Sequence, residues 1–306
     1  MNIVTRSDFD GLCSAMLLKQ VEIIDEVRFA HPRDVQQGDF MITPADIIVN
    51  LPYHRDCGMW FDHHSSEKSR DDLPPAFEGR CEMAPSAARV VANYYKSPRF
   101  DCYKELLAAV DKVDSADLTV QEVANAEGWI LLGFIMDPRT GLGKFHDYAM
   151  SNRELMYKMI EVMATHRADE ILKMYDVRQR VDRYNEEQDK ALEILREKSK
   201  LDGNCIVTDM RGAEVLPTGN RFLIYTLYPD ANINVYIQDG RGGENVAVAI
   251  GHSIFNDRCR VNVGRLLSKY GGGGHKGAGG CTLDAADADR KIRELLNVMR
   301  ENRPVD

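Results

Sequence analysis

The sequence contains no long apolar segment, and this absence excludes the simplest kind of membrane protein. No run approaches the roughly 20 apolar residues that a membrane-spanning helix needs. The first residues, MNIVTRSDFDG, turn acidic too early for a signal peptide. We therefore expect no membrane partner and a cytoplasmic location.

Paired cysteines and an excess of positive charge are also missing. The seven cysteines include no Cys-x-x-Cys pair, so neither a disulfide framework nor a thiolate zinc site is expected. The net charge is −9, which argues against binding of long nucleic acid duplexes by bulk charge. It leaves room for a local cationic pocket, or for an anionic substrate bridged through a metal ion.

The first half of the chain alternates short apolar runs with helical stretches. Such unbroken runs suit a sheet that is covered on both faces, and their alternation with helices indicates a mainly parallel sheet. The predicted strands are 2–5, 26–30, 46–51 and 59–61, and the predicted helices are 12–21, 85–95 and 103–113.

Length and pattern predict two domains joined by helices. A chain of 306 residues, 44% of them hydrophobic, can bury more than one core. Residues 151–200 are charged, nearly free of Gly and Pro, and carry apolar residues at helical spacing. We predict an α/β fold with an N-terminal domain (1–150), a connector of one or two long helices (151–202) and a smaller C-terminal α/β domain (203–306). In the C-terminal domain, strands are expected at 205–210, 233–237 and 245–250, and helices at 261–270 and 285–300.

Two carboxylates stand where the first predicted strand ends and a helix begins. Asp8 and Asp10 lie two residues apart, and Gly11 permits a sharp turn after them. Ligands of open α/β sheets bind outside the carboxyl ends of the strands. Each carboxylate offers oxygen to a hard cation. The alternative interpretation is a helix N-cap, in which Asp10 accepts backbone N–H groups.

A second polar cluster, Asp62-His63-His64, follows the apolar run at 59–61. A carboxylate beside two imidazoles supplies metal ligands and proton-transfer groups at one point. Asp111 and Asp114 lie at the end of a predicted helix. Either is a candidate for a late metal ligand or for a polar helix end, and the sequence alone does not choose between them.

A glycine-rich segment near the C-terminus has the composition of a phosphate-binding loop. Gly271–Gly274 are followed by His275 and Lys276. Glycine allows close approach of the backbone to a ligand, and successive N–H groups form a concavity that binds anions. The segment is not a P-loop, because its sequence pattern is absent. A flexible linker is the alternative, which its position between a helix and a further structured segment disfavours.

Four segments of the chain together resemble the DHH/DHHA1 phosphoesterases, and in particular the exopolyphosphatase-related proteins. They are VTRSDFDGLCSA, WFDHHSSE, AAVDKVDSADLT and NVGRLLSKYGGGGHKGAGG, which occur in the family's order along nearly the whole chain. The resemblance implies two-metal hydrolysis of a phosphate ester, usually with manganese, in a cleft between the domains.

The resemblance also implies roles for individual residues. Asp8 and Asp10 would each bind a metal ion, His63 would be a ligand, and Asp62 would be a ligand or support one. His64 would face the substrate and act on it with Asp62. Asp114, which starts the family-like Asp-Ser, is preferred over Asp111 as the late ligand. The substrate phosphate would be held by Gly272, Gly273, Gly274, His275 and Lys276.

Two positions depart from the family pattern on the same side of the site. The stretch before Asp8 contains Arg6 in place of a histidine, and Asn50 stands where the family has a metal-bridging aspartate. Arginine stays protonated and cannot bind a metal, and asparagine offers one neutral oxygen. The alternative to two ions, Mn²⁺ or Mg²⁺, is therefore one ion held by Asp10, His63 and Asp114. Arg6 would then bind phosphate directly.

These residues are compatible with two functions. The first is a metal-dependent phosphoesterase acting on short phosphate polymers, namely oligonucleotides, dinucleotides or polyphosphate. The second is a weakly active or non-catalytic nucleotide- or phosphate-binding protein, favoured by Arg6 and Asn50. In both, the partner is a small anionic phosphate ester or a short single-stranded oligonucleotide, and a homodimer is left open.

Overall fold

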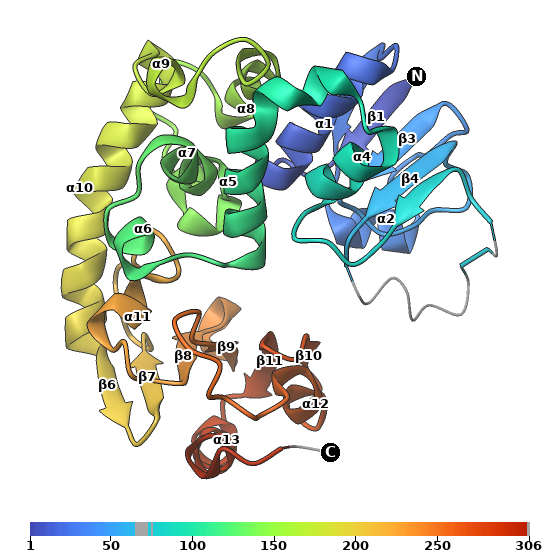
Figure 1. Ribbon diagram of the computed structural model, residues 1–306. Helices are drawn as coiled ribbons and strands as arrows, with labels where there is room; N and C mark the ends of the chain where they lie inside the picture. The colour runs from blue at the N-terminus through green and yellow to red at the C-terminus, as the bar shows by residue number, and fades with distance from the viewer. Residues whose placement is uncertain (65–72, 75, 305–306) are drawn as a thin grey trace. The chain divides into compact units, whose positions relative to one another are not determined.

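The computed structural model describes residues 1–64, 73–74 and 76–304. Contacts divide the chain into two units (Figure 1). The first unit contains 1–117 and 125–184, and the second contains 118–124 and 185–306. The predicted boundaries at 150 and 202 stay a prediction.

The first unit is built on a parallel sheet of five strands. The strand order is β2-β1-β3-β4-β5, and every neighbouring pair is parallel. The strands are β1 (Asn2–Thr5), β2 (Glu26–Phe29), β3 (Asp46–Val49), β4 (Met59–Asp62) and β5 (Gly79–Cys81). The four predicted strands are confirmed, and β5 was not predicted. All residues of β3 and β4 are buried, as expected for a sheet covered on both faces.

Both faces of this sheet are packed against other segments. On one face, Val4, Ile48 and Trp60 form a buried cluster with Val35 of α2 (Pro32–Gln37). Helix α1 (Phe9–Val21) contacts β1 and β3 and also packs against other helices. Its residues from Phe9 to Leu18 are all buried. A helix that is buried all round is held in a fixed position, and so the acidic turn that precedes α1 is fixed as well.

The remaining helices of the first unit pack around α1. α4 (Ala87–Tyr95), α5 (Lys104–Ser115), α7 (Gly128–Met136) and α8 (Asn152–Val162) all contact it. The predicted connector consists of α8, the short α9 (Ala168–Ile171) and the long α10 (Tyr175–Lys198). The first part of α10 belongs to the first unit and its later part to the second. The sequence predicted one or two helices here, and the structure has three.

The second unit is built on a mixed sheet of six strands in the order β10-β11-β9-β8-β7-β6. The β7–β8 pair is parallel and the other pairs are antiparallel. Side chains from the sheet form one buried core with side chains of α12 and α13. The strands are β6 (Ser199–Asp202), β7 (Cys205–Asp209), β8 (Ile233–Asp239), β9 (Asn245–His252), β10 (Gly273–Gly274) and β11 (Ala278–Asp284). The helices are α6 (Val120–Ala124), α11 (Leu223–Leu227), α12 (Val263–Ser268) and α13 (Ala288–Glu301).

The glycine-rich segment forms an ordered hairpin in this unit. Gly273 and Gly274 of β10 pair with Gly280 and Gly279 of β11. Gly274 has φ +148, and a Cβ there would lie 2.3 Å from the carbonyl oxygen of Ala278. Only glycine permits so close an approach of two backbones, so the glycines already have a packing role. The flexible-linker alternative is wrong.

The structure bears on two sequence expectations, which concern membrane-spanning helices and the cysteines. Within the part of the chain that the structure describes, no helix has both the length and the apolarity needed to cross a membrane. All seven cysteines are free thiols.

Candidate metal centre

The polar segments identified in the sequence lie at one edge of the parallel sheet. Asp8 and Asp10 follow β1, Asn50 follows β3, and Asp62 ends β4. These three strands are neighbours in the order β1-β3-β4. Because they are parallel, their carboxyl ends share an edge, where ligands of open α/β sheets bind.

Asp8 is surrounded by hydrogen-bond donors. Its Oδ1 accepts from the backbone N of Gly11 at 3.0 Å and from Nδ2 of Asn50 at 3.0 Å. Its Oδ2 lies 3.0 Å from Nε of Arg6. Asn50 has φ 57, a left-handed conformation that asparagine tolerates. The two residues that depart from the family pattern, Arg6 and Asn50, thus both bind Asp8.

Asp10 is buried and accepts two backbone N–H groups. Its Oδ2 and Oδ1 lie 2.8 Å from the N atoms of Ala87 and Ala88, at the start of α4. Burial raises the pKa of Asp10 well above its usual range, the charge of Asp114 adds to the rise, and the two N–H groups oppose it. A divalent cation would relieve this cost of burying negative charge.

His63 points a free ring nitrogen at two carboxylates. Its Nδ1 lies 3.1 Å from the carbonyl oxygen of Ala84, so Nδ1 carries the proton and Nε2 has a lone pair. Nε2 is buried without a hydrogen-bond partner. It lies 3.2 Å from Oδ2 of Asp114 and 3.8 Å from Oδ2 of Asp10. The ligand atoms of these three residues lie within 4.8 Å of one another, which fits one metal ion.

The structure separates Asp111 from Asp114. Oδ2 of Asp111 accepts from Nη2 of Arg89 at 2.5 Å, and Oδ1 accepts from the hydroxyl of Ser86 at 2.7 Å. Asp114 instead faces His63. Burial raises the pKa of Asp114, and the nearby charge of Asp8 adds to the rise. Asp111 thus joins α5 to α4, and Asp114 is the acidic residue of α5 that faces the cluster.

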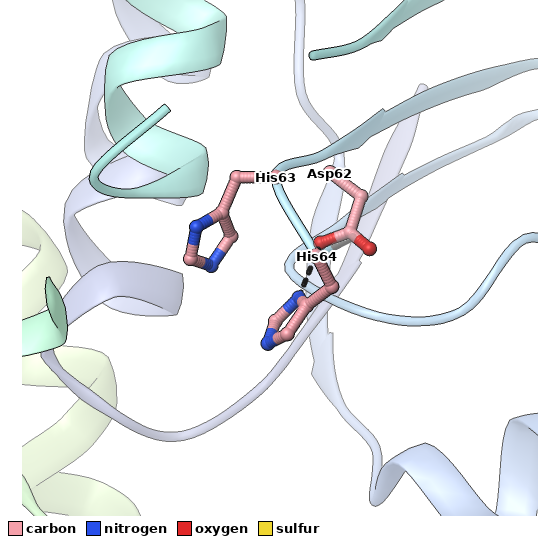
Figure 2. Close-up of side chains that lie close together, drawn as sticks. All are labelled: Asp62, His63 and His64. Atoms are coloured by element: carbon pink, nitrogen blue, oxygen red, sulfur yellow. Dashed lines mark hydrogen bonds and ion pairs between the residues drawn. The ribbon is translucent and has the colours of Figure 1, made fainter. Parts of the chain in front are cut away.

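Asp62 and His64 form a hydrogen-bonded pair beside His63 (Figure 2). Nδ1 of His64 lies 2.8 Å from Oδ1 of Asp62. Burial lowers the pKa of His64, but the hydrogen bond to Asp62 and the neighbouring carboxylates outweigh burial, and the net shift is upward. Asp62, His63 and His64 are a second group whose ligand atoms lie within 4.8 Å. The two groups share His63.

An arginine that no sequence pattern indicated also lies at this site. Arg139 lies in the short helix η2 (Pro138–Thr140) and lines a small pocket with Asp8, Asp10 and Asp114. Its Nε donates to both carboxylate oxygens of Asp137, at 2.8 and 3.1 Å. Burial lowers the pKa of Arg139, but Asp137 and the charges of Asp8 and Asp114 raise it overall. The only sequence signal was a Pro- and Gly-containing loop, which does not indicate a ligand.

The predicted substrate loop lies in the second unit. The N atom of His275 donates to the carbonyl oxygen of Ala278 at 2.7 Å, and the N atom of Gly272 donates to that of Leu267 at 2.9 Å. These two N–H groups are used within the hairpin and not left for an anion. The side chains of His275 and Lys276 are exposed. A phosphate-binding role for the loop stays a prediction.

Fold and site together define a class: a two-unit α/β protein with carboxylates and histidines at the carboxyl edge of a parallel sheet. No family model and no curated protein matches the chain. Among solved structures, a pGpG-specific phosphodiesterase of Vibrio cholerae is 41% identical, with 99% of each chain covered and a TM-score of 0.86. The chain belongs to the DHH family of phosphoesterases.

Two more distant structures share the fold. An exopolyphosphatase-related protein of Bacteroides fragilis is 12% identical, with 98% of this chain and 92% of that chain covered and a TM-score of 0.52. RecJ of Thermus thermophilus in complex with Mn²⁺ is 15% identical and has a TM-score of 0.53. The match covers 99% of this chain but 53% of RecJ. The predicted fold class and family are confirmed.

Proposed function

We propose that this protein is a divalent-cation-dependent phosphodiesterase that hydrolyses pGpG, a linear guanine dinucleotide, to two molecules of GMP. The observation that carries the proposal is the convergence of Asp10, His63 and Asp114 in a chain 41% identical to a pGpG-specific phosphodiesterase. The proposal narrows the predicted class of short phosphate polymers to one dinucleotide.

The proposed ligands of the cation are Asp10, His63 and Asp114. Two carboxylate oxygens and one imidazole nitrogen suit Mn²⁺, and Mg²⁺ is the alternative. When bound, such a cation would neutralise phosphate charge and lower the pKa of a water molecule. The distant similarity to a manganese-containing RecJ agrees with this choice of ion.

The family resemblance makes Asp8 a metal ligand, but we propose that Asp8 instead holds Arg6 in place. Its oxygens accept from Asn50 and Gly11 and pair with Arg6. A second cation bound to Asp8 would be repelled by the permanent positive charge of Arg6. One ion per chain is therefore the proposed count, with Arg6 and Arg139 as additional positive charges for the substrate phosphate.

The Asp62–His64 pair is suited to proton transfer. Asp62 fixes Nδ1 of His64 and so leaves Nε2 as the exchangeable position. The raised pKa of His64 favours the protonated form, which can donate to a leaving oxygen. Hydrolysis forms a bond from the water oxygen to phosphorus and breaks the bond from phosphorus to the 3′ oxygen. The water molecule loses one proton to the solvent, and the 3′ oxygen takes one proton, supplied by His64.

A non-catalytic guanine-nucleotide-binding protein is the second candidate. The observation that favours it is the engagement of Asp8 by Arg6 and Asn50, since these contacts leave fewer oxygens for metal ions. His275 and Lys276 would contribute to phosphate binding under either function. A cytoplasmic location stays a prediction of the sequence, and a homodimer stays open.

The test is incubation of the metal-free protein with pGpG, with and without Mn²⁺, and quantification of GMP by chromatography. The proposal expects GMP to form with Mn²⁺ and not in excess EDTA. A wild-type protein that binds pGpG and forms no GMP with either Mn²⁺ or Mg²⁺ supports the second candidate. The variant His63→Ala is compared with His166→Ala, which removes an exposed histidine.

A further inference from the structure

A cavity of about 320 Å³ lies in the first unit beside the candidate metal centre. Ser7, which precedes Asp8, lines it, and so does Phe29, the last residue of β2. Phe29 pairs with Thr5 at the end of β1, so the cavity lies at the carboxyl edge of the sheet. Asp137 lines both this cavity and the small pocket that contains Asp10 and Asp114. The proposed reaction leaves this cavity without a role.

The walls of the cavity combine apolar side chains with a few polar ones. Phe29, Met136, Leu155 and Met156 supply apolar surface, and the ring of Phe29 lies 4.6 Å from that of Tyr157. Asp137, Asn152, Arg153 and Arg180 supply polar groups. Sites for small organic ligands have volumes of roughly 300 Å³ or more and this kind of lining. The composition fits a flat heteroaromatic group.

Arg180 brings a positive charge that no carboxylate neutralises directly. It is 1% exposed, and its guanidinium lies 3.8 Å from the ring centroid of Tyr148. Its Nη1 and Nη2 donate to two backbone carbonyl oxygens and to Oδ1 of Asn152. Among the described residues it forms no ion pair. A buried unpaired charge favours a ligand that is rich in acceptor atoms.

Asp137 brings the opposite chemistry to the same cavity. It is 7% exposed, and its Oδ1 accepts from the backbone N and Nε of Arg139, each at 2.8 Å. Its Oδ2 accepts from Nε of Arg139 at 3.1 Å, and the carboxylate is a charged acceptor group in the wall of the cavity. Guanine has two donors, N1–H and the 2-amino group, on one edge, and the acceptors O6 and N7 on another.

We infer that this cavity binds one guanine base of the dinucleotide. Asp137 accepts from N1–H and the 2-amino group, and Arg153 and Arg180 provide positive charge and donors for O6 and N7. Adenine lacks the paired donors and places an amino group where guanine has O6. The inference rests on the proposed function and adds to it the means of base selection.

Gly143 offers a way to fill the cavity without disturbing the fold. It lines the cavity, and a Cβ there would meet only Nδ2 of Asn152, at 3.7 Å. We expect Gly143→Leu to keep the melting temperature and to weaken GMP binding in EDTA, measured by calorimetry, at least tenfold. The KM for pGpG should rise at least tenfold, with kcat changed less than threefold. Ala285→Leu, at an exposed turn, is the matched control.

Base selection is tested with Asp137→Asn. The wild type should bind GMP at least tenfold more tightly than IMP, which lacks the 2-amino group, and than AMP. The variant should lose most of this preference, whereas a merely structural role would weaken all three ligands equally. Equal binding of GMP and AMP by the wild type overturns the inference, and so does a Gly143→Leu protein with wild-type GMP affinity and KM.

The outcomes also separate this inference from the proposed function. If the wild type forms no GMP from pGpG but binds GMP in a way that Gly143→Leu abolishes, the hydrolysis is wrong and the guanine site stands. If pGpG is hydrolysed equally by the wild type and Gly143→Leu, the hydrolysis stands and the guanine site is wrong.

Discussion

Nε2 of His63 lies 3.2 Å from a carboxylate oxygen of Asp114, and it has no hydrogen-bond partner although it is buried. A cation bound by both groups explains why this nitrogen lies so close to the carboxylate without a hydrogen bond. Ala84 fixes the other ring nitrogen, as is usual for a histidine that binds metal. The proposed metal site depends on this arrangement.

Removal of the imidazole should remove the metal. Changes in the outer partners of metal ligands alone reduce affinity roughly 10–100-fold, so His63→Ala should reduce Mn²⁺ affinity by about 100-fold or more and abolish GMP formation. Mn²⁺ binding is measured by electron paramagnetic resonance of the free ion. His166→Ala should behave as the wild type, and equal losses in both variants would contradict the assignment.

The two aspartates of α5 should respond differently to the same substitution. Asp114→Asn should weaken Mn²⁺ binding, because Asp114 faces His63. Asp111→Asn should leave Mn²⁺ affinity within a few-fold of wild type and lower the free energy of unfolding by about 1–3 kcal/mol, since it disrupts the pairing with Arg89. The measurements are metal titration and urea unfolding of both variants. The reverse pattern would make Asp111 the ligand.

Arg6 should act on substrate and not on the metal. Arg6→Gln removes a charge that is partly exposed, and the loss of a charge-assisted hydrogen bond of about 1.5 kcal/mol predicts a KM for pGpG roughly tenfold higher. Mn²⁺ affinity should not fall. Arg55→Gln, at a side chain that is 87% exposed, is the control. A loss of Mn²⁺ binding in Arg6→Gln with unchanged KM would reject this role.

Asp62 should affect catalysis more than metal binding. Asp62→Asn keeps the shape of the side chain but weakens its hold on His64, and loss of general acid catalysis predicts a fall in kcat of about 100-fold or more. Mn²⁺ affinity should change less than tenfold. A variant that loses Mn²⁺ completely would show instead that Asp62 is a ligand, as the second group of ligand atoms allows.

Asp46 should make the fold sensitive to acid. Burial raises the pKa of Asp46, but hydrogen bonds from Thr43, Asn2 and Arg28 outweigh burial and lower it overall. The pKa of Asp46 is therefore lower in the folded protein than in the unfolded chain, where it is about 3.9. The stabilisation that ionised Asp46 provides is complete above the unfolded pKa and is lost as the pH falls through the folded pKa. The wild type should therefore lose unfolding free energy below about pH 4 more steeply than Asp46→Asn. Parallel urea-unfolding curves from pH 3 to 6 would contradict this.

The sequence predicted the parallel sheet and the position of its polar edge. The short apolar runs at 46–51 and 59–61 indicate strands that are buried on both faces, as β3 and β4 are. Polar residues that follow neighbouring parallel strands must meet at one edge. The grouping of Asp8, Asp10, Asn50 and Asp62 thus follows from local pattern and topology together.

The local sequence pattern could not decide whether Asp111 or Asp114 is the late metal ligand. Residues three apart are neighbours on one helix face, so helical periodicity places both toward the same side. What separates them is Arg89 and Ser86, which bind Asp111. These two residues belong to a different segment, and their arrival depends on tertiary packing.

Arg139 and the glycine hairpin were missed for two further reasons. Arg139 lies in a short turn without periodicity, and its role depends on Asp137 and on carboxylates far away in the chain. Strands β10 and β11 are rich in glycine, which provides no side-chain alternation and has low strand propensity. The pairing instead comes from close approach of the two backbones.

The proposed single-ion site is tested by titrating metal-free protein with Mn²⁺, with ion binding followed by electron paramagnetic resonance and GMP formation from pGpG measured in the same samples. We expect one tightly bound ion per chain and hydrolysis that rises in proportion to the occupancy of that ion. Full hydrolysis in excess EDTA, or saturation only at two tightly bound ions per chain, would contradict this expectation.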